Sequence, residues 1–329
     1  MKIIVNIAGT KELIMAKGFL KKWILCARPF SFPASTMPVV FGTVLATVYG
    51  HYAFRPGLFL LALVAMVMLH SGANILSDIY DFRKGLDKVP TPVSGGVVRG
   101  LISEKEAFRG AAVLLISGAL IGFLLAYLCG PWLLAIGVGG LFVGIFYTTN
   151  APFSLKYHGL GDLAVFLNFG ILGSLGSWYV QSGTLSFIPV IWAIPMATLV
   201  IAILHANNWR DIESDLKGRI HTVASLLGDR GSSFYYAFLI FGPYVMILLF
   251  ILVPYFIFPS LPKMPFTFLI TLFALPLSVK LWKTAVKRKN LDDPMDFITL
   301  DGATARLNLQ FGLLSTLALL LNLAFGLLF

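Results

Sequence analysis

The 329-residue chain is poor in charge and in cysteine. Only 12% of its residues are charged, whereas 58% are hydrophobic. A soluble domain is usually about half apolar and about a quarter charged, so this composition argues against an ordinary soluble protein and favours lipid as the solvent. The two cysteines, Cys26 and Cys129, fall at opposite edges of the predicted membrane region. They are too far apart to pair, which excludes a disulfide framework.

Histidines in metal-binding patterns are also lacking. The five histidines are His51, His70, His158, His205 and His221. No pair of them has the short spacing that is typical of zinc ligands. The sequence therefore predicts no zinc site.

What the chain has in abundance is long apolar runs. A spanning helix needs roughly 20 apolar residues. Nine such runs lie near residues 33–52, 57–79, 109–128, 131–149, 160–182, 187–207, 234–257, 266–285 and 308–329. They predict an all-α, polytopic membrane protein with nine transmembrane helices in one bundle. We treat residues 1–329 as a single transmembrane domain, with residues 1–27 as a possible amphipathic lead-in or a frayed tail.

The basic residues are distributed unevenly between the two sides of the membrane. The formal net charge is +10, which in a soluble protein would suggest nucleic acid. With nine spans, however, all 25 lysines and arginines except Arg55 and Lys263 fall on the side of the N-terminus. The positive-inside rule then makes that side cytoplasmic. We predict an integral protein of the cell membrane with a cytoplasmic N-terminus, an outer C-terminus and no nucleic-acid partner.

Acidic residues gather in two segments on the predicted cytoplasmic side. Each continues an apolar span, the first at residues 74–87 and the second at residues 207–219. Residues three, four and seven apart share one face of a helix. Asn74, Asp78 and Asp81 therefore form one stripe. A second stripe consists of Asn207 or Asn208, Asp211 and Asp215.

Carboxylates on one stripe repel each other and need a counter-charge. Mg²⁺ is a natural one, because it commonly takes one or two carboxylates together with substrate phosphates. A single acidic helix end could simply be solvated, and Asp81 with Lys84 could form an ordinary ion pair. Two similar clusters on one side favour a functional site, because ionisable groups at membrane depth are expensive to keep.

The two segments are also related by an internal repeat. At an offset of 133 residues, five of the twelve positions 74–85 are identical in the second segment. The matched spans, the second and the sixth, run in the same direction, so the repeat is parallel. Repeats in membrane proteins often place a site at their interface. We therefore predict two four-helix halves around a cavity that opens to the cytoplasm.

Both segments resemble the two aspartate-rich motifs of the UbiA superfamily of intramembrane prenyltransferases. The first is similar to its Asn-Asp-x-x-Asp motif and the second to its Asp-x-x-x-Asp motif. More narrowly, the chain resembles the 1,4-dihydroxy-2-naphthoate prenyltransferases of menaquinone synthesis. Similar segments are residues 27–34 (ARPFSFPA), 80–87 (YDFRKGLD), 159–162 (GLGD), 178–183 (WYVQSG) and 207–211 (NNWRD). Ser77 departs from the family, since it stands where the motif usually has asparagine. The spacing of Asp87 fits the naphthoate branch.

This resemblance implies an enzyme that transfers a polyprenyl group from a prenyl diphosphate to an aromatic acceptor within the lipid bilayer. The expected cofactor is Mg²⁺, held by Asp78, Asp81, Asp211 and Asp215. The acceptor is expected to be dihydroxynaphthoate, which loses carbon dioxide as it is prenylated. Arginine suits bidentate phosphate contacts and lysine point-charge contacts. The expected diphosphate-binding residues are Asn74, Lys84, Arg99, Lys156, Arg210 and Lys217.

Two further residues are candidates for catalysis. Tyr147, at the cytoplasmic end of the fourth span, fits a tyrosine found there in the family and could stabilise a cation. An ordinary interfacial tyrosine is the alternative. Asp162, at the start of the fifth span, could orient or deprotonate the acceptor. Its alternative is an acid favoured by the dipole at a helix N-terminus.

Three other functions were weighed. Another UbiA-type prenyltransferase with a different acceptor would have the same motifs. A transporter built from two repeats is disfavoured, because the acids lie at one membrane face and not at the midplane. Residues 301–306 (DGATAR) match the core of CDP-alcohol phosphotransferases. That family needs an upstream aspartate where this chain has Ile298, so the match is interpreted as chance.

Overall fold

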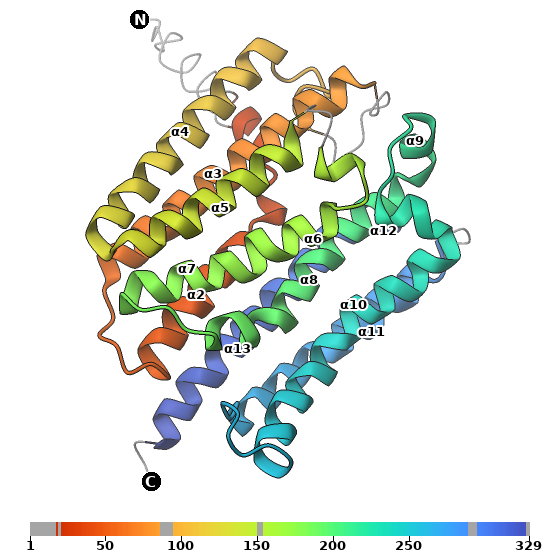
Figure 1. Ribbon diagram of the computed structural model, residues 1–329. Helices are drawn as coiled ribbons and strands as arrows, with labels where there is room; N and C mark the ends of the chain where they lie inside the picture. Colours follow the sequence, from red (N-terminus) through yellow and green to blue (C-terminus); the bar gives the residue numbers. More distant parts are fainter. Residues whose placement is uncertain (1–17, 19–20, 86–94, 150–153, 289–294, 327–329) are drawn as a thin grey trace, which may run out of the picture.

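The computed structural model describes residues 18, 21–85, 95–149, 154–288 and 295–326, and this part of the chain contains no β-strand. A helical segment, 21–27, precedes a short turn of helix, η1 (Pro29–Ser31). The long helices run up and down in one bundle (Figure 1). The elements that follow η1 are α2 (Pro33–Val48), α3 (Pro56–Arg83), α4 (Glu104–Cys129), α5 (Pro131–Thr148), η2 (Leu155–Tyr157), α6 (Gly161–Val165), η3 (Phe166–Leu172), α7 (Gly173–Ser182), α8 (Ile188–Arg210), α9 (Ile212–Lys217), α10 (Val223–Phe256), η4 (Phe266–Ala274), α11 (Leu275–Ala285), α12 (Met295–Ile298) and α13 (Leu300–Gly326).

The predicted all-α membrane fold is confirmed, and each of the nine expected spans corresponds to a helical segment. Eight segments are long and apolar enough to cross a membrane. The ninth, α5, has a shorter apolar stretch, Pro131–Tyr147. It follows α4 through a tight turn at Gly130, whose φ of 126° is a conformation that suits glycine. The predicted lead-in lies mostly outside the described residues.

The largest core lies among α2, α8, α10, η4, α11 and α13. Its biggest fully buried side chains are aromatic: Phe41, Trp209, Tyr236, Phe268 and Phe311. α3 packs on α4 at the other side of the bundle around a smaller cluster. α5 has no buried residue among those described, so it lies at the periphery and faces lipid.

Close helix contact in the centre of the bundle depends on a small residue. A Cβ added at Gly42 of α2 would lie 2.3 Å from the carbonyl oxygen of Ser174 on α7. Small residues let helix backbones approach in membranes, where van der Waals packing drives association. α2 is therefore held directly against α7, and the span that contains α7 is fixed in the middle of the protein.

That span is not regular along its length. α6, η3 and α7 form one continuous segment, of which η3 is a π-helix. Such wide turns are rare and are frequently found at functional sites. Asn168 and Phe169 lie within η3 and line the cavity described below.

Candidate functional site

A cavity of about 340 Å³ lies where α3 and α8 end. Both helices end on the side of the bundle that carries α9 and α12 (Figure 1). The wall contains side chains from both acidic segments, as predicted. The polar residues on it are Arg28, Ser31, His70, Asn74, Ser77, Asp81, Tyr147, Lys156, Tyr157, Asn168, Asn207, Asn208, Arg210, Asp211, Ser214, Asp215, Thr222 and Asp301.

On the first wall, a lysine neutralises Asp81. The ammonium of Lys156 donates to both carboxylate oxygens, at 2.7 and 2.6 Å, and to the hydroxyl of Ser77 at 2.9 Å. The hydroxyl of Tyr157 donates to Asp81 at 3.2 Å. Burial and the charge of Asp81 raise the pKa of Tyr157 well above its usual range, so it remains a donor. Ser77 takes part in this network despite its departure from the family motif.

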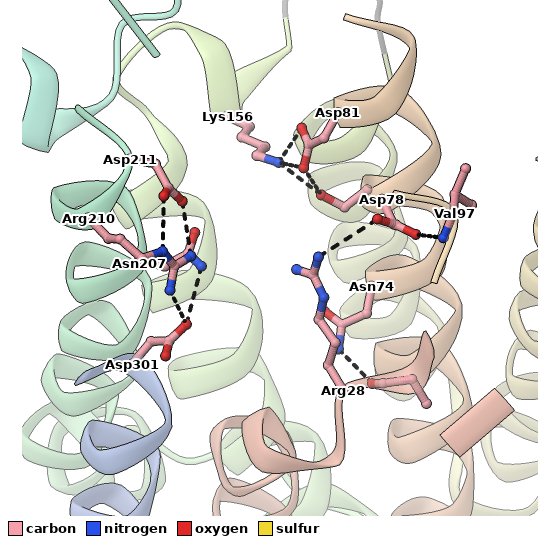
Figure 2. Close-up of polar contacts among 12 residues, drawn as sticks. Arg28, Asn74, Asp78, Asp81, Val97, Lys156, Asn207, Arg210, Asp211 and Asp301 are labelled. Atoms are coloured by element: carbon pink, nitrogen blue, oxygen red, sulfur yellow. Dashed lines mark hydrogen bonds and ion pairs between the residues drawn. The ribbon is translucent and has the colours of Figure 1, made fainter. Parts of the chain in front are cut away.

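Asp78 is buried beside the cavity and is not on its wall. Its Oδ2 accepts a hydrogen bond of 2.8 Å from the backbone N–H of Val97, and its Oδ1 lies 3.9 Å from Arg28 Nη2 (Figure 2). A Cβ at Gly95 would overlap the carboxylate, so glycine is needed for this close approach. In this structure Asp78 therefore holds the backbone at Gly95 and Val97, before α4, whereas the sequence predicted a metal ligand.

Asn74 acts on the segment before α2. Its amide donates to the carbonyl of Ala27 at 3.0 Å and to the hydroxyl of Ser31 at 3.2 Å. Arg28 lies between these two acceptors and has a φ of 53°, which is uncommon for a residue with a side chain. Asn74 thus helps to hold Arg28 at the cavity wall.

On the second wall, an arginine neutralises two aspartates. Arg210 makes a two-pronged contact with Asp211, at 2.9 and 3.0 Å, and its Nη1 donates to Asp301 at 3.0 Å. Asn207 also donates to Asp301, at 3.3 Å. Figure 2 shows this group facing the group of Asp81 and Lys156. Two acidic clusters, each with its own cation, therefore line a single cavity.

The second acidic segment is not one helix. α8 ends at Arg210, Asp211 has non-helical angles, and α9 begins at Ile212. The expected continuous helix was wrong here. The break places Asp215 on a separate short helix, where Thr222 donates to it at 3.3 Å. Burial and the neighbouring charge of Asp211 raise the pKa of Asp215 to about 7.

The two predicted catalytic residues differ in position. Tyr147 lies in the last turn of α5 and lines the cavity. Asp162 is buried at the start of α6, beside Tyr235, and does not line the cavity. The neighbouring polar group is the side chain of Tyr235, which interacts with the Asp162 carboxylate. This position does not favour direct contact between Asp162 and an acceptor in the cavity.

Some of the predicted diphosphate-binding residues line the cavity and others do not. Asn74, Lys156 and Arg210 line the cavity, as do Asn207 and Asn208, whereas Lys84, Arg99 and Lys217 do not. Lys84 lies over the ring of Tyr157, with Nζ 3.5 Å from its centre, and burial lowers its pKa. Lys217 is exposed. Asp87 lies outside the described residues.

Sequence reasoning did not propose several polar residues of the wall, among them Arg28, Tyr157 and Asp301. Arg28 belongs to the segment 27–34 that resembles the naphthoate branch, but no role was predicted for it. Tyr157 carried no signal of its own, since tertiary packing brings it to the cavity. Asp301 did carry one, because an acid at the start of an apolar span needs a partner. In the sequence, Asp301 otherwise belongs only to the chance match of residues 301–306 to another enzyme class.

Among the described residues, no group of three or more His, Cys, Asp and Glu side chains could hold a metal ion alone. The cavity wall nevertheless carries the carboxylates of Asp81, Asp211 and Asp215. Carboxylate and phosphate oxygens are the ligands that Mg²⁺ prefers. This donor set fits Mg²⁺ that binds together with a diphosphate, and it does not form a site made of protein alone.

Residues 35–300 match the model of the UbiA prenyltransferase family. UbiA prenyltransferase domain-containing protein 1 of Danio rerio is 36% identical over 231 residues, which are 68% of this chain and 66% of that protein. The Drosophila melanogaster homolog is 32% identical over 305 residues, or 91% of this chain and 79% of that protein. The chain thus matches slightly less than two thirds of the Danio rerio relative. These names specify no acceptor, so they do not support the naphthoate branch in particular.

Solved structures share the fold. A UbiA homolog from Aeropyrum pernix K1 has a TM-score of 0.57 at 17% identity, with coverage of 87% of this chain and 97% of that one. A UbiA homolog from Archaeoglobus fulgidus, solved with DMAPP and Mg²⁺ bound, has a TM-score of 0.53 at 14% identity. That match covers 90% of this chain and 99% of the other.

Proposed function

The chain belongs to the UbiA prenyltransferase family, and we propose that it transfers a prenyl group from a prenyl diphosphate to an aromatic acceptor. The observation that carries this proposal is the single cavity with an acidic cluster on each of two facing walls. The Archaeoglobus fulgidus relative, bound to DMAPP and Mg²⁺, supports the choice of donor and cation.

The residues of the two walls have complementary tasks. Asp81, Asp211 and Asp215 would hold Mg²⁺, which neutralises the charge that develops on the diphosphate as it leaves. Lys156 and Arg210 now neutralise aspartates. If Mg²⁺ neutralised these aspartates instead, the N–H groups of Lys156 and Arg210 would become available to phosphate oxygens. Arg210 suits two-pronged phosphate contacts, and Asp301 keeps it oriented.

The reaction balances without a further reactant. The bond between the allylic carbon and the diphosphate oxygen breaks, and the electron pair leaves with the diphosphate. The electron-rich ring of the acceptor attacks the allylic cation and forms the new carbon–carbon bond. The ring then regains aromaticity by losing a proton or, in a hydroxy acid, carbon dioxide. Tyr147 and Tyr157 present aromatic surfaces on the cavity wall that can stabilise the cation.

Dihydroxynaphthoate is the acceptor that we propose, with menaquinone synthesis as the pathway. The support is the similarity of residues 80–87 and 207–211 to that branch. We further propose that the cavity opens toward the cytoplasm, because the basic residues are concentrated on that side. The cell membrane remains the proposed location.

The test uses purified protein, dimethylallyl and geranylgeranyl diphosphates, and a panel of aromatic acids that includes dihydroxynaphthoate and 4-hydroxybenzoate. We expect a prenylated naphthol, detected by mass spectrometry, in Mg²⁺ but not after chelation. Asp81→Ala should form none, and Glu213→Ala, an exposed acid on α9, is the control. Product that forms equally well in a chelator would contradict the proposal. Preference for 4-hydroxybenzoate would overturn only the acceptor.

A further inference from the structure

Trp209 anchors the last turn of α8 in the protein interior. Its side chain is 1% exposed, and its ring stands nearly perpendicular to that of Phe297 on α12, with 5.2 Å between the ring centres. The ring of Tyr236 on α10 lies 5.9 Å away. Because helix ends tend to fray, a buried anchor at the next-to-last residue of α8 limits the motion of the residues that follow it.

A carboxylate completes this anchor. The indole N–H of Trp209 donates to Oδ1 of Asp229 on α10 at 2.7 Å. A buried indole N–H needs such an acceptor, so this bond fixes the orientation of the ring. Arg288, just after α11, pairs with Asp229 and lies over the ring of Phe297, 5.1 Å from its centre. We call Trp209, Asp229, Arg288 and Phe297 the tryptophan cluster.

The tryptophan cluster is joined to the second wall of the cavity through neighbouring residues in the chain. Trp209 contacts Phe297. The residues that follow these two, Arg210 and Ile298, share a hydrogen bond of 3.0 Å, which Nη1 of the arginine donates to the carbonyl oxygen. Arg210 also holds Asp211, and both line the cavity (Figure 2). No member of the cluster lines the cavity, so the cluster can act on the site only through the ends of α8 and α12.

We propose that Asp229 is a positioning residue for the diphosphate of the donor. Through Trp209 it holds the end of α8, so that Arg210 and Asp211 face the cavity. The inference rests on the proposed function, in which Arg210 contacts the diphosphate and Asp211 holds Mg²⁺, and it adds a role for a residue outside the cavity. Loss of the hydrogen bond between Asp229 and Trp209 should therefore weaken the binding of a diphosphate.

Three variants separate the effect of this hydrogen bond from the effect of charge. Asp229→Leu removes the acceptor of the indole N–H. Asp229→Asn keeps a side-chain oxygen that can accept the bond and removes the charge that faces Arg288. Glu104→Leu is the matched control, because Glu104 also pairs with an arginine, Arg83, and does not line the cavity. Its side chain is 35% exposed, and that of Asp229 is 36% exposed.

The experiment measures two constants for each purified protein. One is the dissociation constant of inorganic pyrophosphate in Mg²⁺, by calorimetry, and the other is the KM for geranylgeranyl diphosphate. We expect Asp229→Leu to raise both roughly tenfold, because a buried donor without an acceptor disfavours the ordered helix end by about that factor. Asp229→Asn should raise them less than about threefold, since the hydrogen bond is kept. Glu104→Leu should leave both unchanged.

Several results would overturn the inference. They are an unchanged dissociation constant in Asp229→Leu, an equal rise in Asp229→Leu and Asp229→Asn, and an equal rise in Glu104→Leu. If Asp229→Leu does not fold, Trp209→Phe takes its place with the same expected result, because it keeps an aromatic ring and lacks the N–H.

Failure of the proposed function would be recognised separately. If the unchanged protein binds pyrophosphate but transfers no prenyl group, the proposed function fails, and the dissociation constants still decide the role of Asp229. If the unchanged protein does not bind pyrophosphate, both proposals are wrong.

Discussion

The two acidic segments share sequence and differ in structure. Residues 74–85 and 207–218 have five identical positions. The first segment stays on one helix through Arg83, and Gly85 then takes a φ of 66°. The second breaks at Asp211 and begins again as α9. At its end Gly218 has a φ of −79°, and Arg219 adopts the left-handed conformation instead. The same residue types thus end their helices in two ways.

The segments also obtain their cations differently. Asp81 depends on Lys156, which is 75 residues away in the chain, whereas Asp211 is paired with the adjacent Arg210. The first cluster therefore forms only when η2 has packed against α3. The second is partly complete within one turn of chain, although Arg210 still needs Asp301 to satisfy its remaining donors. A repeated motif fixes the type of side chain at a site but not the way in which it is neutralised.

The largest expected effect is a loss of activity when either acidic segment loses a carboxylate that lines the cavity. Asp81→Ala and Asp211→Ala should each lower kcat about 10³-fold or more, because each removes a carboxylate that holds Mg²⁺ in the transition state. Turnover of purified protein at saturating Mg²⁺ is the measurement. Near-normal turnover in either variant would show that the two walls do not act together.

Loss of the basic side chain that pairs with each acidic segment should destabilise the protein by different amounts. Arg210→Met leaves the buried Asp301 without a cation, and breaking a buried ion pair costs about 3–5 kcal/mol. Lys156→Met should cost less, since Tyr157 and Ser77 still donate to Asp81. Thermal unfolding in detergent measures the stability of both variants. Asp301→Asn should partly restore the stability of Arg210→Met. Equal losses of stability in Arg210→Met and Lys156→Met would contradict the proposed difference between the segments.

A smaller effect should distinguish two aspartates of the same segment. Asp78→Asn weakens the hold on Val97, and we expect a loss of about 1–3 kcal/mol in the free energy of unfolding. The Mg²⁺ concentration for half-maximal turnover should change far less than in Asp81→Asn. If the two variants required similarly raised Mg²⁺, Asp78 would be a metal ligand after all, as the sequence predicted.

The smallest effect concerns the two glycines. Gly85→Ala should destabilise the protein by about 1–2 kcal/mol, because an ordinary side chain disfavours its left-handed conformation. Gly218→Ala should be nearly neutral, since its φ is accessible to alanine. Thermal unfolding of the two variants gives the comparison, and a greater loss in Gly218→Ala would contradict it.

Much of the fold could be predicted because its signals are local. Apolar length and the position of charge indicated the spans, and the acidic residues at the ends of two spans indicated the segments that carry Asp81, Asp211 and Asp215. The features that the sequence did not predict depend on packing between distant segments. The break at Asp211 follows no proline or glycine. Asp78 accepts a hydrogen bond from Val97, which is 19 residues away in the chain, and no local pattern predicts that pairing.

The bond between Arg210 and Asp301 has a consequence for how the protein is made. These residues are 91 positions apart, and Asp301 begins the last long helix that the structure describes. Chains emerge from the ribosome in order, and their early parts fold first. During synthesis, the second acidic cluster therefore lacks its final partner until α13 enters the membrane and packs against α2 and α8. A chain interrupted before that helix would carry both aspartate motifs and still lack a finished site.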